Sequence, residues 1–424
     1  MLSPAGPDQS HLIAVSLLTG GGDKPYAFGL ATELIRRRIT LDLIGSDDLD
    51  CLDFRDKPRV HFLNLRGDQR ADVSLAKKIL RVLVYYIKLI GYALTAKSNL
   101  FHLLWNNKFQ SFDRTVLMVY YKLLGKKIAL TVHNVNAARR DSKDSLLNRL
   151  SLRVQYHLTD HFFVHTEKMK VELVEEFGVR EARITVIPFG INNAVPITSI
   201  SCGEARQRLG ISDGQKVILF FGNVAPYKGL AYLVKAFQTL RDQDKRYALV
   251  IAGRPKDAQE YWAAIHASIR EDVELGRILL KAEYIPDAET EVYFKAADIL
   301  VLPYKHIYQS GVLLLGYSFG LPVLAADVGS LRDEIIEGRT GFVFKPEDPT
   351  DLARCISKYF ASDLFRNLNQ RRQEIKEYAA KQYSWEIVGR KTMEVYAQLL
   401  GLPGEAELST ADSPKPAIQV NTRQ

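Results

Sequence analysis

The stretch AADILVLPYKHIYQSGVLLLGYSFGLPVLAADV, residues Ala296–Val328, decides the fold. It runs from a buried apolar strand through a polar loop ending in Ser310 to a helix, a Gly-Leu-Pro turn and a second buried strand. Strand, helix and strand in this order form the unit of a parallel sheet. The backbone N–H groups of Gly311, Val312 and Leu313 should be unpaired at the helix start, where the helix dipole favours negative charge. The stretch therefore predicts a seat for a phosphate group.

A second loop of this kind lies earlier in the chain, in the sequence FFGNVAPYKGL of residues 220–230. We expect Lys228 to open a helix after the strand Val217–Phe221. An ammonium group at a helix start is repelled by the helix dipole, so its presence there suggests an anionic ligand. Two such loops in one α/β domain predict a diphosphate held between them.

Strand and helix patterns alternate along most of the chain. The expected strands are HLIAVSLL, LDLIG, VHFL, LFHLLW, KIALTV, HFFVH and ITVIP in the first half, and VILFF, YALVIAG, RILLK, DILVLP and PVLAA in the second. Helical patterns between them include residues 26–38, 111–124, 145–157 and 228–240. This alternation predicts an α/β fold with doubly wound parallel sheets.

Residues 188–201, which contain Pro and Ser, interrupt the alternation and are the best linker candidate. We therefore expect a Rossmann-like domain at 1–197, a second at 198–382, a final helix at 383–400 that crosses back to the first domain, and a disordered polar tail at 401–424. Ligands collect beyond the carboxyl ends of such strands, so the site is expected in a cleft between two facing domains.

Composition narrows the class of protein. The 424 residues are 47% apolar, enough for buried cores. The three cysteines have no CxxC spacing, so the sequence supports neither a zinc site nor a disulfide framework, and we expect reduced thiols and no metal. The N-terminus lacks the pattern of a secretory signal, which predicts a cytoplasmic location.

Positive charge is concentrated in the first half, where residues 1–197 have 28 Lys and Arg against 20 Asp and Glu. A basic surface attracts nucleic acid or anionic membrane, and no aromatic-basic motif supports nucleic acid. On a helical wheel, residues 75–97 separate a basic arc from an apolar arc, and they are too interrupted to span a bilayer. Either this helix lies peripherally on an anionic inner membrane face, or its apolar arc packs on the sheet.

Six ordered motifs carry a family resemblance: GGGDKPYAFGLATEL, TVHNV, VIPFGIN, FFGNVAPYKGL, VIAGRP and the block from AADILVLP to GLPVLAADVG. Together they span the ordered chain, and the chain resembles the retaining family-4 (group 1) nucleotide-sugar glycosyltransferases, which have the GT-B fold. The resemblance implies a metal-independent transferase without a cofactor. It moves a sugar from a nucleotide diphosphate sugar to an acceptor hydroxyl, and we expect a lipid-linked or saccharide acceptor in polysaccharide or glycolipid synthesis.

The resemblance also implies roles for single residues. His133 would contact the transferred sugar and Lys228 would neutralise the donor diphosphate. The expected diphosphate-binding residues are Gly222, Asn223, Lys228, Arg254, Ser310, Gly311, Val312 and Leu313. The loop expected to close over donor sugar and acceptor comprises Gly20, Gly21 and Gly22, joined by Asn134 and Gln309. A purely structural role is the alternative for three of these residues. His133 and Asn134 could stabilise the turn at the end of their strand, and Arg254 could be a solvated loop residue.

Two departures from the family pattern bear on the donor. Asn223 stands where an arginine is usual, and Ile307 and Leu315 stand where the family has two glutamates that bind sugar and ribose. The identity of the sugar and base is therefore open. A nucleotide-sugar epimerase on the same fold and a catalytically silent nucleotide-sugar-binding homologue are the alternatives.

Overall fold

The structure is a computed structural model of the chain and describes residues 13–21, 24–51, 54–55, 57–70, 73–140, 144–191, 195–256 and 258–402. Gly22 and nearly all of the predicted polar tail lie outside the described residues. Within the described part, no helix has the length and apolar character needed to cross a membrane.

Seven strands form the first sheet, in the order β3-β2-β1-β4-β5-β6-β7. Parallel pairing joins β1 to β2 and β4, β2 to β3, and β4 to β5. The strands are β1 (Ala14–Leu18), β2 (Thr40–Gly45), β3 (Val60–Asn64), β4 (Leu100–Leu103), β5 (Lys127–Val132), β6 (His161–Val164) and β7 (Ile184–Val186).

Six strands form the second sheet, in the order β10-β9-β8-β11-β12-β13, and neighbouring strands pair in parallel. They are β8 (Lys216–Phe221), β9 (Tyr247–Ala252), β10 (Ile278–Lys281), β11 (Ile299–Leu302), β12 (Val323–Ala326) and β13 (Gly341–Phe344). The two Rossmann-like sheets confirm the predicted α/β fold class.

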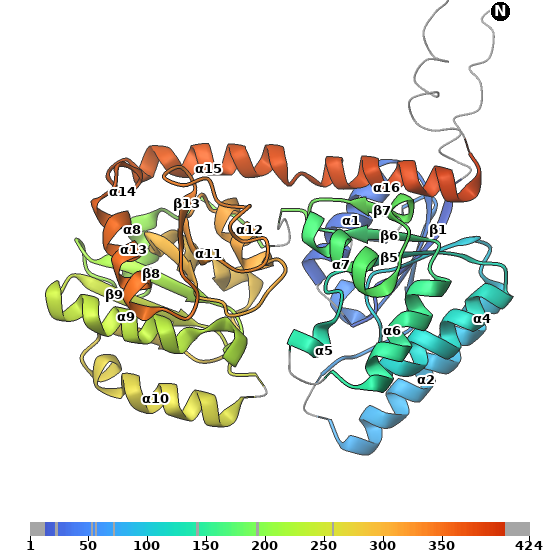
Figure 1. Ribbon diagram of the computed structural model, residues 1–424, viewed down its shortest axis with the longest axis horizontal. Helices are drawn as coiled ribbons and strands as arrows, with labels where there is room; N and C mark the ends of the chain where they lie inside the picture. The colour runs from blue at the N-terminus through green and yellow to red at the C-terminus, as the bar shows by residue number, and fades with distance from the viewer. Residues whose placement is uncertain are drawn as a thin grey trace, which may run out of the picture. The chain divides into compact units, whose positions relative to one another are not determined.

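Helices connect the strands of both sheets (Figure 1). Along the first sheet they are α1 (Lys24–Arg36), α2 (Leu75–Thr95), α3 (Gln110–Phe112), the π-helical turn η4 (Asp113–Leu117), α4 (Met118–Leu123), α5 (Ala137–Arg140), α6 (Leu146–Leu158) and α7 (Glu167–Phe177). Along the second sheet the helices are α8 (Cys202–Arg208), the 3-10 turn η6 (Pro226–Lys228), α9 (Leu230–Gln243), α10 (Gln259–Glu274), α11 (Asp287–Ala296), α12 (Gly311–Ser318), α13 (Pro349–Ala361), α14 (Asp363–Arg366) and α15 (Leu368–Gln382). The last described helix is α16 (Trp385–Leu400).

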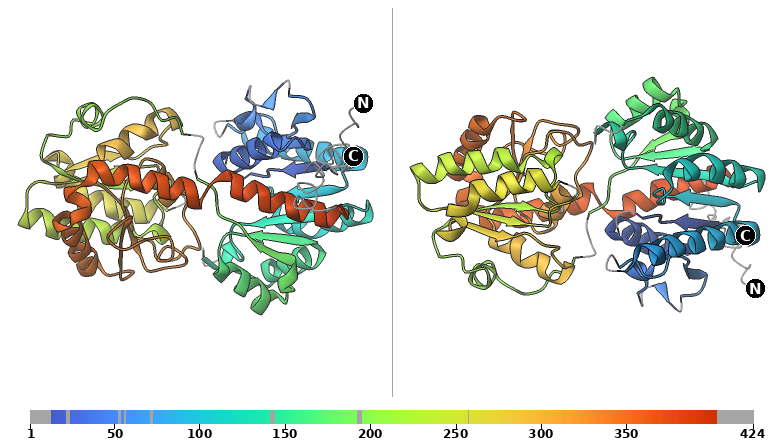
Figure 2. Two further views of the ribbon diagram at one scale, coloured as in Figure 1. Left: turned by 90° about the horizontal axis from the view of Figure 1, so that it is seen from above. Right: turned by 90° about the horizontal axis from the view of Figure 1, so that it is seen from below.

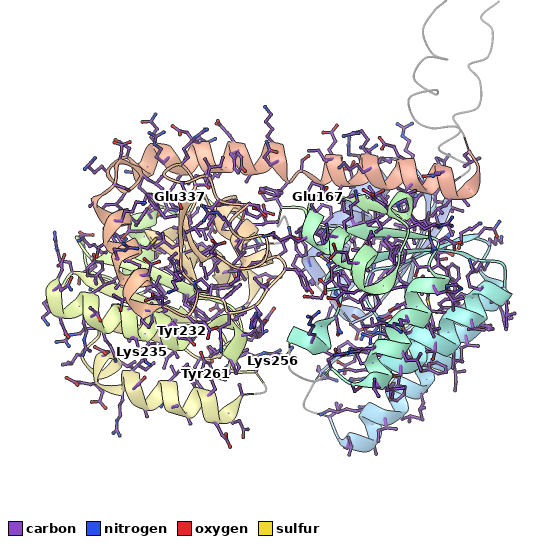
Figure 3. The ribbon with its side chains drawn as sticks, in the orientation of Figure 1. Glu167, Tyr232, Lys235, Lys256, Tyr261 and Glu337 are labelled. Carbon is purple, nitrogen blue, oxygen red and sulfur yellow. The ribbon has the colours of Figure 1, made fainter. Side chains whose placement is uncertain are left out.

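Side chains of the six-stranded sheet alternate between two buried cores. On β8, Ile218 and Phe220 pack with α9, α10 and α13, whereas Val217 and Leu219 pack with α11, α12 and α15. A strand buried on both faces has an unbroken apolar sequence, which is why VILFF was recognisable as a strand. Figures 2 and 3 show helices on both sides of this sheet, and Tyr261 of α10, labelled in Figure 3, accepts a hydrogen bond from the backbone N–H of Ala231 in α9 at 3.1 Å.

The chain forms two compact units, and their boundaries differ from those of the two sheets. One comprises residues 1–131, 154–163 and 389–424, and the other residues 132–153 and 164–388. The later residues of α16 belong to the first unit, where the Tyr396 hydroxyl lies 2.6 Å from Nδ1 of His102 on β4. The domain boundaries expected from the sequence stay a prediction.

Candidate functional site

The six-stranded sheet has its topological switch point between β8 and β11. From this point β9 and β10 extend to one side and β12 and β13 to the other. Loops leaving the carboxyl ends of strands at a switch point separate and leave a crevice, the usual ligand site of open α/β sheets. Residues 222–229 follow β8 and residues 303–310 follow β11, so both loops predicted to bind phosphate flank this point.

Glycines let the loop after β8 pass close to its neighbours. Gly222 has φ +96°, and Gly253, which follows β9, has φ +146°. A Cβ atom on Gly253 would lie 2.1 Å from the Gly222 carbonyl oxygen, so no other residue fits there. The backbone is therefore exposed at the edge of the sheet without an intervening side chain.

Lys228 is the last residue of η6, and its exposed fraction is 7%. The expectation that it opens a helix is wrong, because Gly229, with φ +68°, separates it from α9. Its ammonium nitrogen would lie 2.9 Å from a Cβ atom on Gly222 and is 5.5 Å from the ring centre of Tyr304. The ammonium group is thus placed directly beside the glycine loop, over an aromatic ring that favours a cation.

The loop after β11 is fastened to the Lys228 loop. The backbone N–H of Lys305 donates to the carbonyl of Tyr227 at 2.8 Å. A Cβ atom on Gly229 would lie 1.8 Å from the carbonyl oxygen of Pro303, which shows how closely the two backbones approach. These contacts hold Lys228 in a fixed place relative to the start of α12.

The start of α12 offers two backbone donors. Within the described residues, the N–H groups of Gly311 and Val312 have no hydrogen-bond acceptor, as predicted. The N–H of Leu313 is a correction, because it donates to the carbonyl of Ser310 at 3.1 Å and is not available to a ligand. Val312 faces the glycine loop, since its Cγ2 atom would lie 3.7 Å from a Cβ atom on Gly222.

Ser310 and Tyr304 form the polar back of this seat. Ser310 is the N-cap residue of α12, but its hydroxyl makes no capping bond and donates to the Tyr304 hydroxyl at 3.4 Å. Burial raises the pKa of Tyr304 to about 12, so the phenol stays protonated and neutral. The ammonium of Lys228 and the two free N–H groups are therefore the anion-attracting groups of the seat.

Gln309 has an amide group that lacks a partner. Both its nitrogen and its oxygen are shielded from solvent, and neither has a hydrogen-bond partner in the described part of the chain. Buried amides are nearly always satisfied in native structures. The Gln309 amide is therefore suited to a polar ligand group at this loop.

The predicted residues Arg254 and Asn223 also lie on the loops beside this seat. The backbone N–H of Val224 donates to the carbonyl of Arg254 at 2.9 Å, while the Arg254 side chain is exposed and its guanidinium lies 5.9 Å from the ring centre of Tyr284. Asn223 is half-buried in the glycine loop. Leu315 is 6% exposed and belongs to the core of α12, while Ile307 is half-buried, so neither position supplies a carboxylate.

In the first sheet, His133 directly follows β5 and has a defined tautomer. His165, which follows β6, is buried, and its Nδ1–H donates to the carbonyl of Ile187 at 3.4 Å. The His165 Nε2 must then accept, so the Nδ1–H of His133 donates to it across 3.1 Å. Burial lowers the pKa of His165 to about 4 and keeps it neutral. In this tautomer the Nε2 of His133 is a hydrogen-bond acceptor, the kind of atom to which a hydroxyl group donates.

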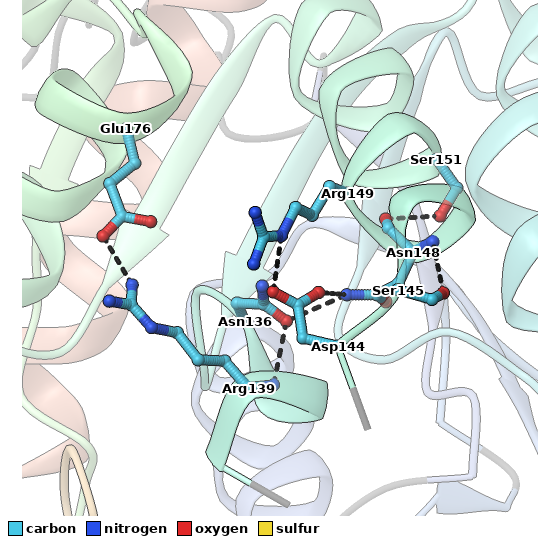
Figure 4. A network of polar contacts seen from close by, with 8 residues as sticks. All are labelled: Asn136, Arg139, Asp144, Ser145, Asn148, Arg149, Ser151 and Glu176. Atoms are coloured by element: carbon cyan, nitrogen blue, oxygen red, sulfur yellow. Dashed lines mark hydrogen bonds and ion pairs between the residues drawn. The ribbon is translucent and has the colours of Figure 1, made fainter. Parts of the chain in front are cut away.

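Side-chain hydrogen bonds brace the loop that follows His133 and Asn134 (Figure 4). The Asn136 amide oxygen accepts from Asn148 Nδ2 of α6 at 3.0 Å. Asp144 accepts from Asn148 Nδ2 at 2.8 Å, a bond that lowers the pKa of its carboxyl group. These bonds fix the backbone at the carboxyl end of β5, where His133 and the half-buried Asn134 lie.

The glycine run after β1 lies at the switch point of the seven-stranded sheet, where β1 neighbours β4. A Cβ atom on Gly20, whose φ is +56°, would lie 2.3 Å from the carbonyl oxygen of Trp105. A Cβ atom on Gly21 would lie 3.1 Å from the Arg66 guanidinium. Sequence reasoning missed Arg66, Tyr304 and His165, because no motif or spacing marks them and only tertiary contacts bring them to these edges.

No group of three or more His, Cys, Asp or Glu side chains that could hold a metal ion is found in the ranges that the structure describes.

Two family models match the chain. The model described as Glycosyl transferases group 1 matches residues 203–382, and the model described as Glycosyltransferase Family 4 matches residues 20–195. The first match contains the loops after β8 and β11, and the second contains the glycine run and His133.

The chain is similar in sequence to D-inositol 3-phosphate glycosyltransferases. It is 28% identical to the protein of Corynebacterium urealyticum over 263 aligned residues. This alignment covers 60% of this chain and 61% of the relative. It is 25% identical over 270 residues to the protein of Streptosporangium roseum, covering 63% and 61%. The chain thus spans about three fifths of the length of these curated relatives.

Solved structures share the fold at low identity. Sucrose-phosphate synthase from Thermosynechococcus elongatus has a TM-score of 0.72 at 18% identity, covering 92% of this chain and 99% of that one. Anabaena HepE in complex with UDP has a TM-score of 0.68 at 15% identity, covering 91% and 100%. WaaG, a glycosyltransferase involved in lipopolysaccharide biosynthesis, has a TM-score of 0.63 at 16% identity, covering 92% and 100%. The solved structures and the two parallel sheets show that the chain has the GT-B fold. The two family matches, over residues 20–195 and 203–382, show that it belongs to the group 1 glycosyltransferases.

Proposed function

We propose that this protein transfers a sugar from a nucleotide diphosphate sugar to an acceptor hydroxyl with retention of configuration, and that the acceptor is lipid-linked or close to a membrane. The observation that carries the proposal is the seat at the β8/β11 switch point. There the Lys228 ammonium, the Gly222 backbone and the two free N–H groups of α12 converge.

Charge flow explains how this seat would act. Breaking the bond between a sugar and a nucleotide diphosphate places negative charge on the leaving phosphate oxygens. Fixed cations and N–H donors aimed at that charge lower the barrier, because they need no reorganisation during the reaction. The backbone that carries Lys228 is held in place by the contacts of its loop with the loop after β11, so its ammonium group is kept beside the glycine loop. We infer that the protein needs neither a metal ion nor a cofactor for this step.

His133 is suited to holding the transferred sugar. Its Nδ1–H is committed to His165, so its Nε2 accepts a hydrogen bond, and a sugar hydroxyl is a donor of that kind. In the same way Gln309 offers an amide that both donates and accepts. The acceptor hydroxyl would attack the face of the sugar from which the diphosphate departs.

We propose the class of the donor, a nucleotide sugar, but not its sugar or its base. Anabaena HepE, which shares the fold, has structures in complex with UDP and with UDP-glucose, and this supports a nucleotide-sugar donor here. The apolar Ile307 and Leu315 at the usual glutamate positions indicate that sugar and ribose are recognised by other groups, of which Gln309 is the best placed.

The surface of α2 supports a membrane-proximal acceptor. Tyr85, Tyr86, Leu89 and Ala93 pack inward, as an ordinary surface helix requires. A second apolar stripe faces solvent at helical spacing and comprises Leu80, Leu83, Val84, Ile87 and Leu94, exposed by 39–71%. A helix that is apolar on two faces and carries Lys77 and Lys88 between them fits an anionic bilayer surface. We therefore propose a cytoplasmic protein bound peripherally to the inner face of the membrane.

Turnover of a donor panel tests the proposal. Purified protein would be incubated with UDP, GDP and ADP sugars and a membrane lipid extract, and the anomeric configuration of the product read by NMR. We expect transfer from one donor with retention. Failure of every donor to bind or turn over would contradict the proposal. Binding without turnover would instead support a silent homologue, which the two missing glutamates favour as the second candidate.

A further inference from the structure

A basic pocket lies in the first compact unit, away from the diphosphate seat in sequence. It has a volume of about 450 Å³, and its lining includes the cations Arg66, Arg70, Lys78, Arg81 and Lys108. No Asp or Glu is among the described residues that line it. A concave surface lined by charges of one sign concentrates the opposite charge, so the pocket is built for an anion.

Four of these cations form no ion pair with a carboxylate among the described residues. Arg66 donates to the side chain of Gln69 at 3.5 Å and Arg81 to the carbonyl of Arg70 at 3.5 Å, while Asp48 and Asp68 act on them only as nearby charges. Lys78 and Lys108 make no ion pair with the described residues, whereas Arg70 pairs with Asp68. Four cations without an ion pair in one pocket repel each other, and a bound anion would reduce this repulsion.

Arg66 is the innermost of these cations. It is half-buried, its guanidinium lies 5.7 Å from the ring centre of Tyr85, and burial lowers its pKa below the usual range. Its Nη2 atom would lie 3.1 Å from a Cβ atom on Gly21. The pocket therefore reaches the glycine loop at the carboxyl end of β1, where an acceptor is expected.

Hydrogen bonds brace the wall of the pocket that Tyr85, Tyr86 and Asn107 form. The buried carboxylate of Asp113 accepts from the Tyr86 hydroxyl at 2.9 Å and from the backbone N–H of Asn107 at 2.6 Å. The Tyr85 hydroxyl donates to the Asn107 amide oxygen at 2.7 Å. These bonds keep the aromatic rings in place, and a preformed pocket binds without the cost of ordering side chains.

We propose that this pocket binds the phosphate group of the acceptor, with Arg66 and Arg81 as its principal contacts. That the bound molecule is the acceptor rests on the proposed function. Binding of phosphate to the pocket can be measured without sugar transfer. Planar guanidinium groups match phosphate oxygens in a bidentate manner, which is why arginines suit this role. The phosphate belongs either to a lipid headgroup or to a water-soluble polyol phosphate, and Ile79, Val82 and Phe109 would receive an apolar group beside it.

The test measures binding to the full chain without donor. One arm uses glycerol 3-phosphate and inorganic phosphate, and the other compares phosphatidylcholine vesicles with and without phosphatidic acid. Arg66→Gln and Arg81→Gln remove pocket cations. Lys127→Gln removes an exposed cation of β5 that neither lines the pocket nor belongs to α2, so it controls for net charge.

We expect each pocket variant to bind phosphate roughly tenfold or more weakly than Lys127→Gln, as for loss of a charged hydrogen bond. Dependence on Arg66 in the soluble arm identifies a polyol phosphate, and dependence only in the vesicle arm identifies a lipid. If Arg66→Gln and Arg81→Gln bind like Lys127→Gln in both arms, the assignment is wrong. Arg81 is half-exposed, so its variant remains informative if Arg66→Gln fails to fold.

Donor hydrolysis without acceptor separates this inference from the proposed function. If the wild-type chain turns over no nucleotide sugar but binds phosphate through Arg66, the proposed function fails and the pocket stands. If it turns over a donor while phosphate binding ignores Arg66, the pocket assignment alone fails.

Discussion

Replacing Gly222 with alanine should weaken diphosphate binding without unfolding the protein. Gly222 has φ +96°, and its new Cβ atom would lie 2.9 Å from the Lys228 ammonium and 3.7 Å from Val312 Cγ2. The first distance is too short for contact, but the atom concerned is the end of a flexible side chain, so Lys228 can move aside. The second distance is an ordinary contact. The methyl group therefore displaces the ammonium and spares the core.

The cost divides into two parts. An alanine at positive φ costs about 1–2 kcal/mol of folding free energy. Loss of the charge-assisted contact of Lys228 with a diphosphate costs roughly 1.5–3 kcal/mol of binding free energy, which is on the order of 10-fold to 100-fold in affinity. The matched control is Gly214→Ala, because Gly214 has φ +79° and nothing within 4 Å of its Cβ position. It carries the backbone strain alone.

Urea unfolding and calorimetric titration with UDP, GDP and ADP separate these parts. We expect both alanine variants to lose similar stability and only Gly222→Ala to lose nucleotide affinity. Equal affinities of the two variants would refute the placement of the diphosphate beside Gly222. A stability loss for Gly222→Ala several times that of Gly214→Ala would refute the argument that Lys228 can move aside.

Three further predictions concern stability and the membrane surface. Burial lowers the pKa of His102 to about 3 and of His165 to about 4, below the unfolded value, so their contribution to stability is present above about pH 6.5 and is lost as pH falls. Protonation of each histidine in the unfolded chain should lower the unfolding free energy by about 2 kcal/mol at pH 5. Equal stability to urea at pH 7 and pH 5 would contradict this. Gly229→Ala should destabilise by about 3 kcal/mol or more, since its Cβ would lie 1.8 Å from the Pro303 carbonyl oxygen, and a urea midpoint like that of wild type would refute the close approach. Ile87→Glu, at a side chain exposed by 71%, should leave stability within about 0.5 kcal/mol and weaken sedimentation with anionic vesicles, whereas unchanged sedimentation would count against the membrane face.

The fold could be predicted from the sequence because the central strands of both sheets are buried on both faces. Each of the twelve expected strands is present, since unbroken apolar runs such as VILFF and DILVLP are typical of buried parallel strands. Strand β13 was missed, because four residues beginning with Gly341 carry too little pattern to distinguish a strand from a turn. Gly341 is required there by the neighbouring strand, since its Cβ would lie 1.8 Å from the carbonyl oxygen of Val323.

Site features could be predicted from the sequence only where all of their residues lie in one loop. The position of Lys228 beside a glycine loop could be predicted from FFGNVAPYKGL. The 3-10 turn could not, because it depends on Pro226 beginning it and on Gly229 ending it before α9 begins. The Leu313 hydrogen bond to Ser310 likewise depends on how tightly the first turn of α12 winds. The tautomer of His133 depends on His165, which reaches it from another strand and leaves no mark on the local sequence.

The most direct measurement is the affinity of Lys228→Ala for the nucleotide diphosphate of the working donor, compared with Lys235→Ala. Lys235 is an exposed lysine of α9 and carries the same charge, so the pair isolates position from charge. We expect Lys228→Ala to bind on the order of tenfold or more weakly and to lose sugar transfer, with Lys235→Ala unchanged. If Lys228→Ala bound and transferred like Lys235→Ala, the diphosphate would not be held at the β8/β11 switch point.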